Sequence, residues 1–151
     1  MGLVRRHRAT ADFHSEPEED RVLCSQPMSI PVELAALAER IEEFGPIAYL
    51  VSVSAESLPH VVSVRVGWDD ASLVVGAGRQ TLANVESHPE VTLLWPAPAG
   101  SAYGLIVDGT ARLLPDTTEP TLGIDPTKGV LHRTPEGDPT APSCITLLRS
   151  S

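Results

Sequence analysis

The sequence predicts a mainly β protein, a barrel or a sandwich, with two short helices. Short stretches in which apolar and polar residues alternate recur from residue 47 onward, and turn residues separate them. Only two stretches, residues 31–44 and 81–87, show the helical spacing of apolar residues. With 151 residues, 42% of them hydrophobic, the chain is long enough for one domain with its own core.

The first 28 residues differ from the rest. Arginines are followed by a run of acidic residues, with few apolar side chains between them. Such a segment buries too little surface to offset the entropy lost on ordering. We therefore expect a disordered or extended arm over residues 1–28, or an extension ahead of an alternative start at Met28, and a domain over residues 29–151.

In the domain, Pro31 suits the first turn of a helix over residues 31–44, and Gly45 and Pro46 end it. The predicted strands cover residues 47–54, 60–68, 73–75, 91–95, 103–114, 130–134 and 145–148. Apolar alternation keeps its phase across Asp108 and Gly109, which predicts a β-bulge there rather than a hairpin turn.

The turn between the strand at 73–75 and the helix at 81–87 is the clearest candidate binding site. Gly76 and Gly78 precede a helix N-terminus, where main-chain N–H groups favour an anion. Arg79 adds a donor fork that suits phosphate, and Thr81 and Asn84 add short polar groups. A strand-to-helix turn with a solvated arginine is the alternative.

Composition excludes several classes of function. The formal net charge of −9 disfavours nucleic acid and anionic membranes as partners. The two cysteines and five histidines show no metal-ligand spacing, so we expect no metal. No apolar run reaches the length of a membrane span, and we expect a cytoplasmic protein.

The order of these segments resembles that of the pyridoxamine 5′-phosphate oxidase-like split barrels that bind FMN or the deazaflavin F420. Four segments carry the resemblance: residues 59–65 (PHVVSVR), 78–84 (GRQTLAN), 88–95 (HPEVTLLW) and 105–111 (LIVDGTA). The resemblance implies a six-stranded antiparallel split β-barrel over residues 29–151. It also implies a homodimer with the flavin in a groove between the subunits. Trp68, Trp95 and Tyr103 lie near the ends of predicted strands, where a subunit interface would bury them.

The resemblance further implies a flavin- or deazaflavin-dependent oxidoreductase, with FMN as cofactor and F420 as the alternative, that transfers hydride to or from a small organic substrate. The residues beside the ring and ribityl chain would be Val62, Ser63, Val64 and Arg65. Those holding the phosphate would be Gly78, Arg79, Gln80, Thr81 and Asn84.

Three departures from the family pattern keep other functions open. Thr81 stands where the oxidases carry a phosphate-binding lysine, and Gly104 lies near the position of a ring-contacting glutamine. A C-terminal segment that recognises pyridoxal phosphate has no match, so vitamin B6 oxidation is not expected. No catalytic acid or base stands out, although His60 and Tyr103 are candidate proton donors. A non-catalytic flavin-binding or scaffold homodimer is the alternative, and a haem-binding split barrel is a weaker one.

Overall fold

The computed structural model describes residues 27–133 and 135. Its elements follow one another as β1 (Ser29–Val32), η1 (Leu34–Ala36), α2 (Leu37–Phe44), β2 (Ile47–Val53), β3 (Pro59–Asp69), β4 (Ser72–Gly76), α3 (Arg79–Ser87), β5 (Glu90–Trp95), β6 (Tyr103–Leu113) and β7 (Thr121–Arg133). The predicted strand over residues 145–148 lies outside the described residues.

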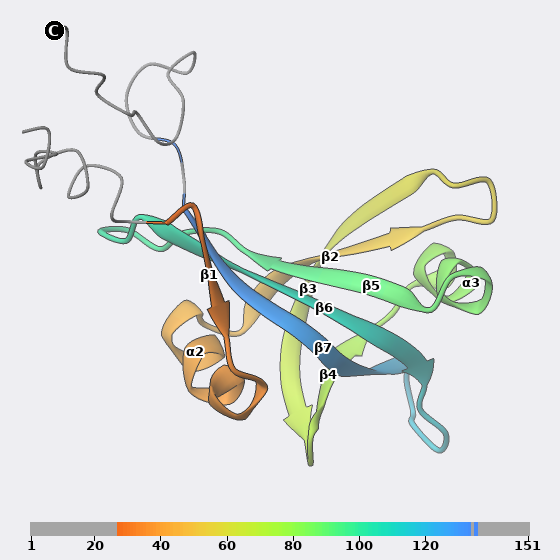
Figure 1. Ribbon diagram of the computed structural model, residues 1–151. Coiled ribbons are helices and arrows are strands. Elements are labelled where there is room, and N and C mark those ends of the chain that lie inside the picture. Colours follow the sequence, from red (N-terminus) through yellow and green to blue (C-terminus); the bar gives the residue numbers. More distant parts are fainter. Residues whose placement is uncertain (1–26, 134, 136–151) are drawn as a thin grey trace, which may run out of the picture.

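Six strands close into an antiparallel barrel in the order β7, β4, β3, β2, β5 and β6, and β6 pairs back with β7 (Figure 1). β1 is a seventh strand, which pairs antiparallel with the second half of β7. The predicted fold class, a six-stranded antiparallel barrel with two short helices, is therefore confirmed, with one strand added.

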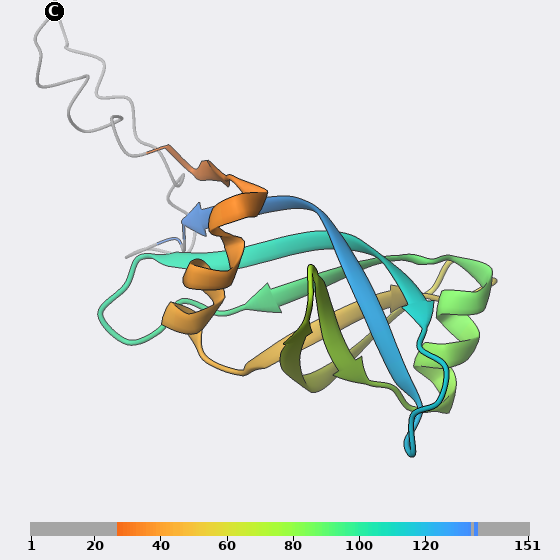
Figure 2. The ribbon, with the colours of Figure 1, turned by 90° about the horizontal axis from the view of Figure 1, so that it is seen from below.

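The two α-helices lie at opposite ends of the barrel, as two perpendicular views show (Figures 1 and 2). α2 buries Leu37 and Ile41 against the barrel and ends at Gly45, whose φ of 88° suits glycine. Trp95 is fully buried at this end and donates a hydrogen bond from Nε1 to the Gly45 carbonyl over 2.9 Å. Trp95 is thus a core residue, and its expected place in an interface is wrong.

The predicted helix over residues 31–44 begins too early. Residues Ser29–Val32 form β1, and Pro31 pairs with Val130 of β7. A proline without an N–H group is tolerated in this strand because β1 lies at the edge of the sheet. The chain then passes through the 3₁₀ turn of η1, and the α-helix begins only at Leu37.

The bulge predicted at Asp108 and Gly109 is confirmed in position. Asp108 pairs with Lys128 and Gly109 with Pro126, so the extra residue is Thr127 of β7. β7 itself spans 13 residues, Thr121–Arg133, whereas only its end was predicted. Except for Thr121 and the bulged Thr127, the residues that were missed pair with β6, which shows that tertiary pairing decides their structure.

The core fills the barrel interior. The fully buried apolar side chains come from α2 and from every barrel strand except β3, whose Val64 and Val66 are nearly buried. Within residues 27–133 and 135, no helix combines the length and apolar character needed to cross a membrane.

Candidate functional site

The end of β4, which leads into α3, lies beside β3: Val75 pairs with Val66, and Gly76 lines a surface pocket together with Arg65. This junction holds the predicted site. β3 alternates across the barrel wall: Val64 and Val66 are buried inside, while Ser63 and Arg65 are exposed outside. β4 ends at Gly76, two residues before the helix N-cap, Gly78. Strand alternation therefore gives the outer surface two polar side chains, and one of them, Arg65, lines a pocket with Gly76 shortly before the helix N-terminus.

Gly78 and Arg79 present the open end of α3. Gly78 is extended (φ −80°, ψ 173°), and no side chain caps it. A Cβ atom at Gly78 would meet nothing within 4 Å, so the main chain there is open to close approach. The first amides of a helix have no acceptor within the helix, and Arg79 beside them is exposed and forms no ion pair with any described residue. This junction suits an anion.

Two of the predicted phosphate ligands point elsewhere. Thr81 and Asn84 are each 1% exposed and face the barrel. Asn84 accepts a hydrogen bond from Gln80 Nε2 over 2.7 Å and donates one from Nδ2 to Ser52 Oγ over 3.0 Å. Gln80 is exposed, so these three side chains lead from the surface into the barrel end.

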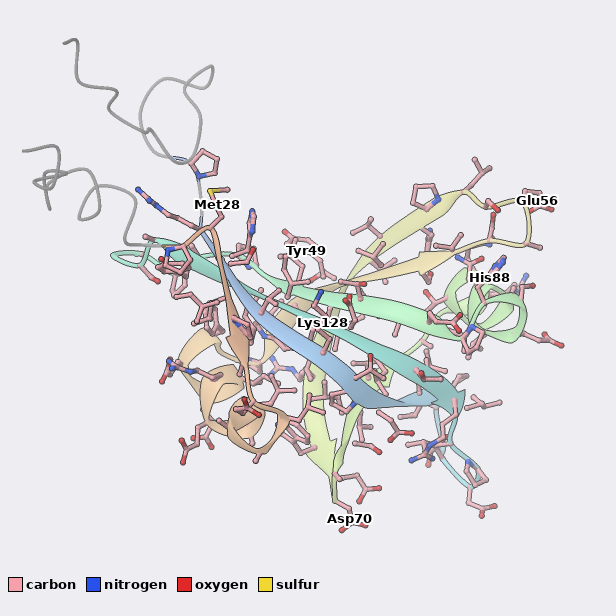
Figure 3. The ribbon with its side chains drawn as sticks, viewed as in Figure 1. Met28, Tyr49, Glu56, Asp70, His88 and Lys128 are labelled. Atoms are coloured by element: carbon pink, nitrogen blue, oxygen red, sulfur yellow. The ribbon has the colours of Figure 1, made fainter. Side chains whose placement is uncertain are left out.

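Beside these residues, a pocket of about 550 Å³ opens between the β2–β3 hairpin and α3. Figure 3 shows Glu56 at the tip of this hairpin and His88 next to α3. The pocket is lined by Ser54, Glu56, Leu58, Pro59, His60, Gln80 and Asn84. His60, a candidate proton donor, is thus brought together with two of the predicted site residues.

Tyr103, the other candidate proton donor, is not part of this site. It lies at the start of β6, and its hydroxyl donates a hydrogen bond to the Pro27 carbonyl over 3.2 Å. Gly104 next to it has no room for a side chain, because a Cβ atom would lie 2.9 Å from the Trp95 carbonyl oxygen. Close packing against the Trp95 main chain therefore explains the glycine here, near the position where the family carries a glutamine.

A larger trough of about 660 Å³ lies on the outer surface of β3 and β4, and the sequence did not predict it. Arg65 and Gly76 line it, together with Gly67, Val74 and residues that follow β6. In the sequence, the available sign of this trough was a glycine at each of two exposed strand positions, Gly67 and Gly76. No group of three or more His, Cys, Asp or Glu side chains in the described part of the chain is arranged to hold a metal ion.

Two proteins of known sequence are similar to this chain over most of its length. No family model matches the sequence. An uncharacterized protein of Mycobacterium bovis is 35% identical over 132 residues, which cover 76% of this chain and 90% of the relative. An uncharacterized protein of Mycobacterium tuberculosis matches with the same identity and coverage.

Three solved structures share the fold at low identity. A FAD-binding protein of Mesorhizobium loti has a TM-score of 0.54 at 14% identity, covering 70% of this chain and 98% of that one. A Clostridium acetobutylicum protein of the pyridoxinephosphate oxidase family has a TM-score of 0.54 at 14% identity, over 68% and 91%. The haem storage protein HutZ of Vibrio cholerae has a TM-score of 0.53 at 12% identity, over 68% and 96%.

The chain has the split-barrel fold of the pyridoxamine 5′-phosphate oxidase-like proteins, which confirms the resemblance predicted from the sequence. It belongs to one family with the two mycobacterial proteins.

Proposed function

We propose that this protein binds FMN at the start of α3 and is a flavin-dependent oxidoreductase acting on a small organic molecule, with F420 as the alternative cofactor. One observation carries the proposal: Gly78 and Arg79 are exposed at an open helix N-terminus, directly after the end of β4, where Gly76 lines a surface pocket with Arg65 of β3. The FAD-binding protein with the same fold supports a flavin over other phosphate-bearing ligands.

The described residues fit the phosphate end of such a cofactor. Gly78 admits close approach, the first amides of α3 donate hydrogen bonds, and Arg79 supplies the charge. Thr81 and Asn84 are buried, so they would support the helix from inside rather than touch the phosphate. On the outer face, Ser63 and Arg65 offer polar contacts, whereas Val62 and Val64 would offer only their main chain.

When bound, the flavin would supply the hydride chemistry. The protein's part is to hold the phosphate, to shield one face of the ring with β3 and to leave the other face open. His60 is the described histidine that lines the adjoining pocket, so it is the candidate proton donor there.

A second copy of the chain is the proposed partner. The outer faces of β2 and β3 expose Ile47, Tyr49 and Val61, which are 48%, 45% and 56% accessible. In register, Ile47 lies opposite Arg65 and Tyr49 opposite Ser63, so this apolar surface adjoins the proposed cofactor site. Exposed apolar patches next to a site are typical of interfaces. Light scattering at micromolar concentration should give a dimer mass, and a monomer mass would contradict the proposal.

The phosphate assignment is tested by titrating FMN and riboflavin against wild type and Arg79→Ala. Loss of a charge-assisted hydrogen bond costs about 1.5–3 kcal/mol, which is about ten- to a hundredfold in affinity. FMN should lose that much, while riboflavin, which lacks the phosphate, should lose far less. Equal losses for both ligands, or no loss for FMN, would refute the assignment.

A non-catalytic flavin-binding homodimer is the second candidate. It is favoured by two positions that offer no polar contact to a cofactor, the buried Thr81 and the closely packed Gly104. An assay with reduced FMN or F420 and a panel of quinones and enones separates it from an enzyme. The absorbance spectrum of the purified protein separates a flavin from haem, the weaker alternative that HutZ represents.

A further inference from the structure

A cavity of about 340 Å³ lies beside the tip of the β3–β4 hairpin and is here called the hairpin cavity. It is lined by Leu34, Ala38, Trp68, Asp70, Ala71 and Pro126. Its walls therefore come from η1, α2, β7 and the hairpin, whose tip carries Asp70 (Figure 3). This tip lies at the start of β4, whereas Gly78 and Arg79 follow the end of β4. The five residues of β4, about 16 Å at 3.3 Å per residue, thus separate the cavity from the proposed phosphate site.

Two large apolar side chains of the hairpin cavity are exposed. Trp68 is 39% exposed and Leu34 is 49% exposed. Strand alternation places Trp68 on the same side of β3 as the buried Val64 and Val66, so it continues their row to the end of the barrel core. Small-molecule sites typically have apolar and aromatic walls of this kind, with volumes of about 300–1,000 Å³. The cavity is therefore suited to a small ligand with an apolar body.

Among the described residues that line the cavity, Asp70 alone is charged. Its φ of 52° belongs to the two-residue turn, Asp70 and Ala71, that joins β3 to β4. Its carboxylate is exposed, and neither ion pair of the described residues, Arg40–Glu43 or Arg112–Asp125, includes it. An indole ring attracts a cation through the negative face of its π system, and a carboxylate attracts the same cation by charge. The net charge of −9 disfavours an anion in this cavity as well.

We propose that the hairpin cavity binds a small hydrophobic amine, with its ammonium group at Asp70 and the Trp68 ring and its apolar body on Leu34 and Ala38. This site goes beyond the proposed function and does not depend on a bound flavin. Trp68 also lines the trough on β3 and β4, but the other residues of the hairpin cavity do not.

Calorimetric titration at pH 7 tests this with three probes of similar shape: the cation phenethylamine, the neutral phenethyl alcohol and the anion phenylacetate. Wild type should bind phenethylamine about three- to thirtyfold more tightly than phenethyl alcohol, the combined size of an exposed ion pair and a cation–π contact. Phenylacetate should bind more weakly than the alcohol. Tryptophan emission locates the site, because the chain has two tryptophans and Trp95 is fully buried. Phenethylamine should therefore change the emission of Trp68.

Variants separate the two attractions. Asp70→Asn removes the charge and keeps a residue that tolerates a positive φ, and Trp68→Leu keeps an apolar wall and removes the ring. Each should lower the preference for the amine over the alcohol by about two- to fivefold, and the double variant should abolish it. Ala38→Met, which places a larger side chain in the cavity, should weaken both the amine and the alcohol.

The matched control is Asp116→Asn. Asp116 also has a positive φ, 61°, but lies on the loop between β6 and β7, so this variant should bind like wild type. Thermal melting checks that each variant folds. Absence of phenethylamine binding at millimolar concentration, or an unchanged preference in Asp70→Asn, would overturn the proposal. Trp68 emission that shifts on dilution of the protein, without amine binding, would assign the cavity to a second copy of the chain instead.

A parallel titration with FMN separates this inference from the proposed function. Saturating FMN should leave phenethylamine binding unchanged, and displacement of the amine by FMN would overturn the hairpin cavity as a separate site. Binding of phenethylamine without FMN binding would refute the proposed cofactor and leave the hairpin cavity intact.

Discussion

The inner and outer faces of β2 and β3 differ in what they contribute. On the inner face, Ala48, Leu50 and Ser52 of β2 are at most 1% exposed and face the barrel core. On the outer face, Ile47 and Tyr49 are nearly half exposed, beside Arg65 and Ser63 of β3. The same two strands therefore stabilise the barrel with one set of alternate residues and offer a binding surface with the other.

The largest expected effect is on the inner face. Leu50→Ala leaves a cavity among fully buried side chains and should lower the free energy of unfolding by about 2–5 kcal/mol. Tyr49→Ala, one residue away, should change it by about 0.5 kcal/mol or less at a protein concentration where the chain is monomeric. Urea unfolding measures both. Similar losses in the two variants would contradict the division between the faces.

Asn84 tests the same division between buried and exposed residues at the candidate binding site, the start of α3. Asn84→Ala removes the partner of the buried Ser52 hydroxyl and should cost about 1–3 kcal/mol in the free energy of unfolding. Arg79→Ala, one turn earlier in α3, should change stability by about 0.5 kcal/mol or less. Thermal melts and FMN titrations of both variants provide the comparison. Full stability with weakened FMN binding in Asn84→Ala would mean that Asn84 contacts the ligand, as its sequence position predicts.

Much of the fold could be predicted from periodicity. β2, β3, β5 and β6 alternate clearly, and their predicted bounds differ from the structure by one residue or less at each end. β1 was missed because a proline before apolar residues at helical spacing is equally typical of a helix start. Most of β7 was missed because Gly123, Asp125, Pro126 and Gly129 have low strand propensity, and pairing with β6, β4 and β1 makes that segment a strand.

The candidate site could be predicted only in part. The exposed side chains Ser63 and Arg65 follow from strand alternation, and the open helix start follows from Gly78. The inward direction of Thr81 and Asn84 does not, because short polar residues on a short helix suit either a ligand or a buried network. Ser52, which links Asn84 to the barrel, lies 32 residues from it, and spacing along the chain gives no sign of that contact.

Ser72, Arg112 and Asp125 form the described polar network that joins three barrel strands, β4, β6 and β7. The Ser72 hydroxyl and Arg112 Nε both donate hydrogen bonds to the Asp125 carboxylate, the latter over 3.4 Å. These contacts, Ser72 first, hold the pKa of Asp125 below its ordinary value, although partial burial opposes them. Arg112 and Asp125 are each about half exposed, so the network differs from the buried contacts of the inner face.

The smallest effect is therefore expected from this network and depends on pH. A carboxylate with a lowered pKa in the folded state adds stability above its unfolded pKa of about 3.9, and that stability is lost as the pH falls through the folded value. Asp125→Asn should thus unfold slightly more easily than wild type at pH 7, and the difference should shrink as the pH falls below the unfolded pKa. Urea unfolding at several pH values measures it, with Asp116→Asn as a control on the loop between β6 and β7. A difference between Asp125→Asn and wild type that stays constant from pH 7 to pH 3 would show that the contact acts through shape rather than charge.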